Sequence, residues 1–170
     1  MKFFIRPVRI EDAEQLNALR RQPETARTML ALPSERVDRA ENFIKNLDMY
    51  NHEFVAVTTL PGGSEKLVGV AGISVKKSPR LNHCADFGIC VDKNCWGQGI
   101  GSALMEQVLD LADNWLRLVR VELTVDFDNE RAIHLYEKYG FEREGVQRKA
   151  CVRDGEYIDL IMMSRIRHAD

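Results

Sequence analysis

The chain has 170 residues, of which 45% are hydrophobic and 29% are charged, with 11 glycines and 5 prolines. This mixture is typical of a globular protein of one domain, and it excludes disordered, collagen-like and disulfide-dense classes. The formal net charge is −2 at pH 7, so no basic field indicates nucleic acid as a partner. No apolar run reaches the ~20 residues of a membrane span. We therefore expect a single domain over residues 1–170, with no nucleic-acid or membrane partner.

The first part of the chain predicts a strand and two helices. Residues 3–8 alternate apolar and polar side chains, as strands do, and residues 11–21 have helical spacing with Asp12 available as a cap. Two prolines interrupt residues 22–33, which we interpret as an irregular or broken-helix connection. Residues 34–47 predict the second helix, because their apolar positions fit the helical period.

Three strands are predicted next. Residues 53–60 and 67–77 are joined by Pro61-Gly62-Gly63-Ser64, a combination that favours the tight reversal of a hairpin. A third strand, residues 85–92, follows after a short loop. Because the links between these strands are short, we expect them to pair in antiparallel fashion.

The second half alternates helices and strands. It predicts a helix over 100–116, a strand over 118–125, a helix over 130–139, and two strands that flank Arg153-Asp154-Gly155. Asp-Gly between two apolar-rich strands is a strong hairpin signal. The first of these helices is expected to carry one apolar stripe made of Ile100, Leu104, Val108, Leu111, Ala112 and Trp115. The element order predicts one mixed α/β domain.

Cysteine and histidine usage indicates a reducing compartment. The cysteines are Cys84, Cys90, Cys95 and Cys151, and the histidines are His52, His83, His134 and His168. No Cys-x-x-Cys pair occurs and the histidines are scattered, whereas a zinc site needs clustered ligands. The residues from Met1 to Arg6 lack the long apolar stretch of a signal peptide. We expect reduced thiols, no metal site and a location in the cytosol.

The turn before the helix 100–116 predicts an anion site. Three glycines at alternate positions, Gly97, Gly99 and Gly101, lie between the end of a strand and the start of this helix. Free N–H groups and the helix dipole attract anions there, and glycine removes the Cβ atoms that would keep a phosphate away. A helix start in which glycine only eases a turn is the alternative. A P-loop is excluded because no Gly-Lys-Ser/Thr follows, and Ser102 stands where a dinucleotide fingerprint needs glycine.

A second segment completes the pattern. Residues 129–141 open a helix whose residues Ala132, Leu135, Tyr136 and Tyr139 share a face, and Gly140 ends it. Taken alone, Tyr136 is typical of a core tyrosine. The glycine turn together with the pattern Asn-x-x-Ala-x-x-Leu-Tyr-x-Lys-x-Gly-Phe at 129–141 resembles the GNAT superfamily of acyl-CoA-dependent N-acetyltransferases. One departure is Trp96, where the family usually has Gln or Arg.

This resemblance extends over nearly the whole chain. It implies a single-domain fold with a mostly antiparallel central sheet of about six or seven strands, about four flanking helices and splayed strands that hold the CoA arm. A closer resemblance, carried by residues 85–91, 113–117 with 120–124, and 155–157, is to a bacterial L-amino-acid N-acetyltransferase subgroup. That likeness suggests a free amino acid as the acceptor.

The resemblance also implies the residues of the site and acetyl-CoA as co-substrate. The thioester would lie in a gap between strands 85–92 and 118–125, with a backbone N–H near Val91 as oxyanion donor. The residues implied in binding acetyl-CoA are Ile89, Cys90, Val91, Trp96, Gly97, Gln98, Gly99, Ile100, Gly101, Ser102, Asn129, Ala132 and Tyr136.

Two side chains are candidates for proton transfer. Tyr136 matches the family's general acid, which protonates the leaving thiolate; a free tyrosine has a pKa of ~10 against ~8.5 for a thiol. Asp86 lies where several family members carry a catalytic Glu. A carboxylate of pKa ~4 is a weak base toward an ammonium, so Asp86 would act through water. An exposed strand-end aspartate is the alternative, and Glu122 and Asp126 are the fallback bases.

We predict transfer of acetyl from acetyl-CoA to a primary amine, by direct attack in a ternary complex, with the α-amino group of a small molecule such as an amino acid as acceptor. A protein N-terminal or side-chain acetyltransferase and a non-catalytic acyl-CoA sensor stay open as alternatives. The acceptor wall is expected from helices 12–21 and 35–47 and the hairpin 153–157. An amino acid's carboxylate needs a cationic or N–H partner, for which Arg80, Arg148 and Arg153 are candidates. A second copy of the chain, forming a homodimer, is a further candidate partner.

Overall fold

The computed structural model of the chain describes residues 1–167, so His168 lies outside the described residues. The chain forms two compact units. The first unit consists of residues 1–74 and 88–109, and the second of residues 75–87 and the chain from residue 110 onward. Strand β4 (Cys84–Val91) passes from the second unit into the first.

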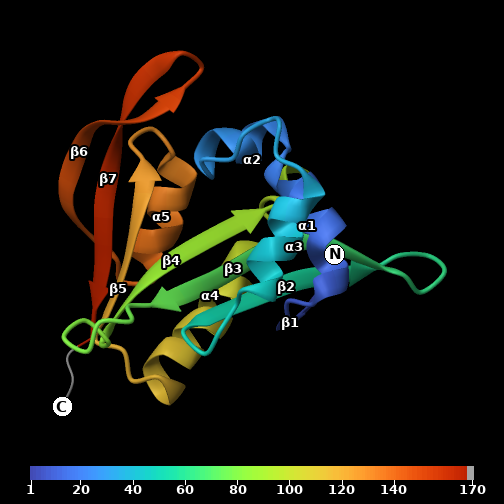
Figure 1. Cartoon of the computed structure of the whole chain (residues 1–170), viewed down its shortest axis with the longest axis horizontal. Coiled ribbons are helices and arrows are strands. Elements are labelled where there is room, and N and C mark those ends of the chain that lie inside the picture. Colours follow the sequence, from blue (N-terminus) through green and yellow to red (C-terminus); the bar gives the residue numbers. More distant parts are fainter. Residues whose placement is uncertain (168–170) are drawn as a thin grey trace. The chain divides into compact units, whose positions relative to one another are not determined.

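The first unit holds strands in the order β1-β2-β3-β4 (Figure 1). These are β1 (Phe4–Pro7), β2 (Asn51–Thr59), β3 (Glu65–Val75) and the end of β4, and β2 pairs with β1 and with β3 in antiparallel fashion. Asp92 N–H donates to the Val68 carbonyl, and Lys76 N–H to that of Cys84, each at 2.9 Å. Both bonds fit one antiparallel register of β3 and β4, so the predicted pairing of the three strands is confirmed.

Helices lie on both faces of these strands. The unit contains the 3-10 turns η1 (Ile10–Asp12) and η2 (Lys93–Cys95) and the helices α1 (Ala13–Arg20), α2 (Pro23–Thr28), α3 (Val37–Lys45) and α4 (Ile100–Asp110). Val55 and Val70 pack with Leu16 of α1 and Ala40 of α3 in one core, so α1 and α3 cover their face of the sheet (Figure 1). The adjacent Gly69 faces the other way. A Cβ there would lie 3.0 Å from Leu104 Cδ1, so glycine allows α4 to pack closely on the opposite face.

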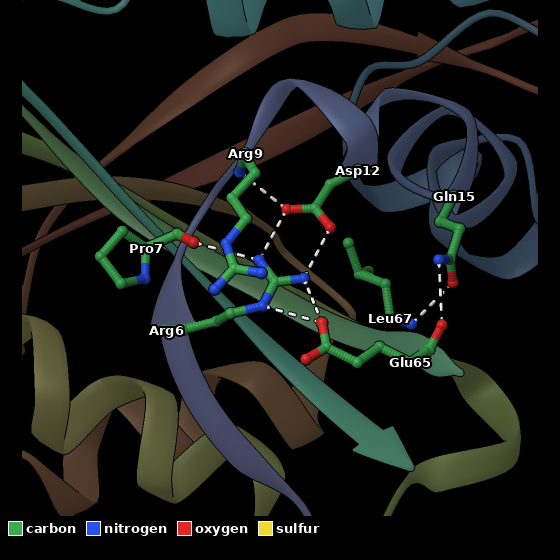
Figure 2. Close-up of polar contacts among 7 residues, drawn as sticks. All are labelled: Arg6, Pro7, Arg9, Asp12, Gln15, Glu65 and Leu67. Carbon is green, nitrogen blue, oxygen red and sulfur yellow. Dashed lines mark hydrogen bonds and ion pairs between the residues drawn. The ribbon is translucent and has the colours of Figure 1, made fainter. Parts of the chain in front are cut away.

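Two sequence expectations about these helices are wrong. Asp12 does not cap α1, because its carboxylate accepts the Arg6 guanidinium at 2.8 Å and the Arg9 N–H at 2.7 Å (Figure 2). The second helix begins at Val37, three residues later than predicted. The buried Glu35 carboxylate explains this start, because it accepts Arg20 Nε at 3.2 Å and the Leu32 N–H at 3.3 Å, which holds the chain outside the helix.

The second unit has strands in the order β4-β5-β7-β6 and one long hairpin (Figure 1). It contains β5 (Arg120–Asp126), α5 (Glu130–Lys138), β6 (Glu142–Arg153) and β7 (Glu156–Ile166). β5 is parallel to β4 over Cys84–Asp86 and antiparallel to β7. Asp154 and Gly155 have φ of +53° and +81°, so the predicted Asp-Gly hairpin turn is confirmed.

The predicted helix 100–116 changes its winding before it ends. α4 ends at Asp110, and a π-helix, η3, covers Leu111–Trp115. Leu104, Val108 and Ala112 are buried as expected, but Trp115 is 76% exposed, so its place on the apolar stripe is wrong. A π-turn contains more residues than an α-turn, which rotates later side chains away from the face that the α-helical period predicts.

These elements make a mixed α/β fold of seven strands, mostly antiparallel, with five α-helices within residues 1–167. The fold class agrees with the prediction, and the helix beyond the expected four is α2, in the segment expected to be irregular or a broken helix. The four cysteines are buried and free. Over the described residues, no helix is long and apolar enough to cross a membrane, and no group of His, Cys, Asp and Glu side chains could hold a metal ion.

A polar network on β5, β6 and β7 gives a test of the second unit. Arg120 Nη1 donates to Glu144 Oε1 at 2.8 Å and Ser164 Oγ donates at 2.6 Å, and these hydrogen bonds lower the pKa of Glu144 to about 2. A pKa lowered by folding stabilises the protein above the ordinary carboxyl range, and this stability is lost as the pH falls toward 2.

We predict that Glu144→Gln lowers the Tm by roughly 1–3 °C at pH 7, since the pair is partly exposed. The difference from wild type should shrink between pH 4.5 and 3, as measured by thermal denaturation. Glu142→Gln, at an exposed position of the same strand, is the matched control and should not change the Tm. A difference for Glu144→Gln that is as large at pH 3 as at pH 7 would assign the effect to packing.

Candidate active site

The glycine turn lies in the first unit and has the backbone that its sequence predicts. Gly97 and Gly99 have φ of +73° and +81°, in the left-handed region that favours glycine. No atom lies within 4 Å of the position that a Cβ would take at either residue. Ala103 N–H donates to the Gly99 carbonyl as α4 begins, so the N–H groups of the preceding turn have no intrahelical partner. Backbone N–H groups with open space beside them fit an anionic ligand such as a pyrophosphate.

The residues around this turn hold it to the end of β4. The Trp96 indole N–H donates to the Val91 carbonyl at 2.9 Å, and the buried Asp92 carboxylate accepts the Asn94 N–H at 2.9 Å. Trp96 therefore positions the turn, a role that its place in the motif did not indicate. Cys90 points into the core, with its thiol 3.9 Å from the Thr25 hydroxyl, so only its backbone is available to a ligand.

Asn129 and Tyr136 belong to α5, in the second unit. The Asn129 side chain accepts the Ala132 N–H at 3.3 Å, so it caps the helix. Tyr136 is 7% exposed and its ring packs against Phe87 of β4, at 6.2 Å between centroids, and against Phe141 at 5.8 Å. The ring of Tyr136 is thus a core aromatic, as its spacing alone indicated, and the general-acid role that the resemblance implies would belong to its hydroxyl group.

Asp86 lies on the other face of the same stretch of β4. Successive residues of a strand point to opposite faces, and Phe87 contacts Tyr136, so Asp86 points away from Tyr136. Its side chain is 56% exposed and pairs with Lys76, which also pairs with Glu122 at 3.3 Å. The hydrogen bond to Asp86 raises the pKa of Lys76. Burial raises the pKa of Glu122, but hydrogen bonds from Arg120 and Lys76 lower it overall. Both carboxylates therefore already have cationic partners.

The fallback base Asp126 lies at the end of β5. It is 3% exposed and pairs with Arg153 at 3.0 Å, and Arg153 also holds Asp128 at 2.6 Å. Burial raises the pKa of Asp126, and the charge of Arg153 offsets part of this increase. With two carboxylates on its guanidinium, Arg153 is a poor candidate for binding an acceptor's carboxylate.

The other two candidate arginines are both exposed. Arg148 lies in the irregular part of β6, where the pairing with β7 shifts between Gln147 and Cys151. This part of the hairpin extends beyond the carboxyl end of β5. Arg80 lies in the loop before β4, at the amino end of the parallel strands. Active sites of sheets with parallel strands form at the carboxyl ends, which favours Arg148.

The sequence did not single out Glu53 of β2. Its carboxylate has no hydrogen bond or ion pair among residues 1–167. Burial raises the pKa of Glu53 to about 7, although the charge of Arg20 partly opposes this. An acidic residue next to the apolar run 54–57 of this strand was its sequence signal, and buried acidic residues are more often members of structural ion pairs.

A sequence profile described as the acetyltransferase (GNAT) family matches residues 16–141. The chain belongs to the acetyltransferase (GNAT) family. GNAT acetyltransferases use acetyl-CoA as co-substrate.

Individual relatives agree on the family and differ in acceptor. The chain is similar to L-amino acid N-acetyltransferase AaaT of Escherichia coli K12, with 50% identity over 101 residues. That match covers 59% of this chain and 62% of that protein, less than two thirds of either. A spermidine N(1)-acetyltransferase of the same organism is 26% identical over 96% of this chain and 86% of its own. The crystal structure of a GNAT acetyltransferase from Streptococcus pneumoniae superimposes with a TM-score of 0.81 at 30% identity, covering 97% of this chain and 99% of that one.

Proposed function

We propose that this acetyltransferase transfers the acetyl group of acetyl-CoA to the α-amino group of a small amino acid. The observation that carries the proposal is the 50% identity over 101 residues to an L-amino acid N-acetyltransferase. The spermidine acetyltransferase similarity is weaker in identity but longer, so polyamines form the competing class of small acceptors. Acetylation of protein N-termini or side chains, and acyl-CoA sensing without turnover, are the two functions from outside the small-molecule class that an experiment must exclude.

An acceptor screen tests this function directly. Release of free CoA thiol from acetyl-CoA would be followed with a panel of L-amino acids, spermidine, one short peptide and no acceptor. We expect amino acids to be turned over with a kcat/KM above those of spermidine and the peptide. A faster reaction with spermidine or the peptide would replace the acceptor class. Binding of acetyl-CoA without turnover of any amine would favour the sensor.

In the proposed mechanism the amine attacks the thioester carbonyl directly. Support for Tyr136 as the acid is its place in the family motif and its packing, which fixes the ring. A backbone N–H near Val91 would stabilise the oxyanion, and Ile89 and Val91 would pair with the pantetheine arm at the end of β4. A carboxylate must also take the proton of the ammonium group, and Asp86 is the candidate that the family position supplies. Tyr136 packs on the face of β4 to which Phe87 points, and Asp86 points to the opposite face. This arrangement suits a thiolate that leaves on one side of the strand and an amine that arrives on the other.

We propose that Arg148 binds the carboxylate of an amino-acid acceptor, because Arg153 already holds two carboxylates. Arg148→Gln should raise the KM for the amino acid roughly 10- to 100-fold, the range for a lost charge-assisted hydrogen bond. The KM for acetyl-CoA should not change. Arg80→Gln is the matched control and should behave as wild type in the same steady-state assay. Equal effects of the two substitutions would remove Arg148 from the acceptor site.

We further propose that residues 1–170 act as one acetyltransferase domain, with acetyl-CoA and a small amine as partners. The family match supports this, since it includes residues of both units. A cytosolic location is supported by four free buried cysteines, which a reducing compartment keeps as thiols. A homodimer stays a prediction that sedimentation would test.

A further inference from the structure

Three neighbouring strands of the first unit carry an unusual row of residues on the face that α1 and α3 cover. β2 contributes Glu53, which pairs with Gly72 of β3. The register of β3 and β4, given by the bond from Asp92 N–H to the Val68 carbonyl, places Gly88 of β4 opposite Gly72. In the next row Val55, Val70 and Cys90 are core residues beneath α1 and α3, so Glu53, Gly72 and Gly88 belong to the same face.

The two glycines make room at this point of the sheet. A Cβ at Gly72 would overlap the Glu53 carboxyl group, so the carboxyl group lies directly over Gly72. At Gly88 a Cβ would meet no atom within 4 Å, and the residue is exposed. The Glu53 carboxylate therefore lies beside an open space over Gly88. Gly88 belongs to β4, the strand that leads into the glycine turn.

The cationic side chains on this face of the sheet and on the helices that cover it are already paired with carboxylates. On α1, Arg20 donates to Glu35 at 3.2 Å, and Glu35 also accepts Arg39 of α3 at 3.1 Å. On β1, Arg6 pairs with Asp12 and Glu65 on the same face, a closed network shown in Figure 2. From α2 and β4 come the Thr25 hydroxyl and the Cys90 thiol, which contact each other. Glu53 has no hydrogen bond or ion pair among the described residues, and the cation whose charge acts on it, Arg20, is already paired with Glu35.

We propose that Glu53 binds the ammonium group of the acceptor over Gly72 and Gly88 and accepts its proton, in place of Asp86. This inference rests on the proposed transfer of acetyl to an amine. An N–H bond of the ammonium breaks, the proton goes to a carboxylate oxygen of Glu53, and the freed electron pair forms the N–C bond to the thioester carbon. The C–S bond then breaks, the thiolate leaves with a proton from Tyr136, and the nitrogen loses its remaining extra proton to water. An acceptor ammonium would supply the missing positive partner, and Asp86 is less suited because Lys76 already holds it.

The chemistry of proton transfer agrees with this geometry. Burial raises the pKa of Glu53 to about 7, whereas an ordinary carboxyl group has a pKa of ~4. For an ammonium of pKa ~8, the equilibrium constant for proton transfer to Glu53 is unfavourable by about tenfold, because the two pKa values differ by roughly one unit. For transfer to an ordinary carboxylate of pKa ~4, the same constant is unfavourable by about 10⁴-fold. Glu53 is thus a far stronger base than an ordinary surface carboxylate.

The test compares Glu53→Gln with Asp86→Asn on whichever acceptor the wild type turns over fastest. We expect Glu53→Gln to lower kcat/KM for the acceptor at least 10²-fold and to remove the rise of this parameter with pH near 7, with the Kd for acetyl-CoA unchanged. Asp86→Asn should keep the rise of kcat/KM with pH near 7. The opposite result, with the rise lost only in Asp86→Asn, would overturn the proposal and return the role to Asp86.

Stability separates a chemical role from a structural one. A carboxyl pKa raised by folding means that the charged form opposes folding, so the cost is absent near pH 4 and complete above pH 7. Glu53→Gln should therefore have a Tm above wild type at pH 8 and equal to it at pH 4, despite its lost activity. A Tm lowered at pH 8 would show that the carboxylate is structural and contradict the proposal.

A second variant tests the open space. Gly88→Val should leave the Tm and the Kd for acetyl-CoA unchanged, because the added atoms meet no protein neighbour at the Cβ position, but it should raise the KM for the acceptor at least tenfold. An unchanged KM would place the acceptor elsewhere. If amino acids are not substrates but spermidine or a peptide is, the acceptor assignment fails while Glu53 is still tested on that amine.

Discussion

Tyr136→Phe is expected to lower kcat about 10²-fold or more and to leave acetyl-CoA affinity nearly unchanged. The substitution keeps the ring that packs between Phe87 and Phe141 and removes only the hydroxyl group. If that group protonates the leaving thiolate, the tetrahedral intermediate collapses without help, and the loss falls on kcat. Single-turnover kinetics with acetyl-CoA bound would measure the chemical step itself.

Tyr139→Phe is the matched control, three residues further along the chain at the end of α5, with its ring next to the Lys138 ammonium. It should retain wild-type kcat. A Tyr136→Phe enzyme with most of its kcat would make Tyr136 a packing residue, and the acid would then be water or another group. Thermal denaturation should give similar Tm values for both variants, since neither leaves a cavity.

Gly99→Val is expected to weaken acetyl-CoA binding at least 10²-fold, because a branched side chain would occupy the space beside the backbone N–H groups that fit a pyrophosphate. The φ of +81° at Gly99 also strains any L side chain. Strain alone must therefore be separated from the loss of the anion site. Isothermal titration calorimetry with acetyl-CoA and with CoA would measure the affinity.

Gly62→Val is the control that separates backbone strain from loss of the anion site. Gly62 has φ of +98°, no atom within 4 Å of its Cβ position, and lies in the β2–β3 hairpin of the same unit. Both substitutions should lower the Tm by similar amounts, but only Gly99→Val should lose acetyl-CoA. Equal affinities of the two variants would remove the glycine turn from the binding site.

Much of the fold follows from local sequence. The Pro61-Gly62-Gly63-Ser64 and Asp154-Gly155 turns set two hairpins, because their residue types fit the backbone conformations that those turns require. Helix limits were less predictable where tertiary contacts decided them. Asp12 has the chemistry of a cap, but an arginine on β1 competes for its carboxylate. Glu35 similarly delays α3 because Arg20 holds it outside.

The candidate site also has a part that local sequence predicts and a part that only tertiary structure reveals. The glycine turn and the α5 motif are contiguous in sequence, so the spacing of a few residues indicates them and the ligand that they fit. Glu53 depends on Gly72 and Gly88, which only strand pairing brings beside it. No short segment contains that arrangement, and it becomes visible only with the register of three strands.

The π-helix at the end of α4 has a practical consequence for spectroscopy. The chain contains two tryptophans, and the altered winding leaves the Trp115 indole in water while the Trp96 indole is bonded to the end of β4, beside the glycine turn. Trp115→Phe would thus give a protein with one tryptophan fluorophore, located where the pyrophosphate is expected to bind. Its emission would report acetyl-CoA binding directly, without a label and without turnover.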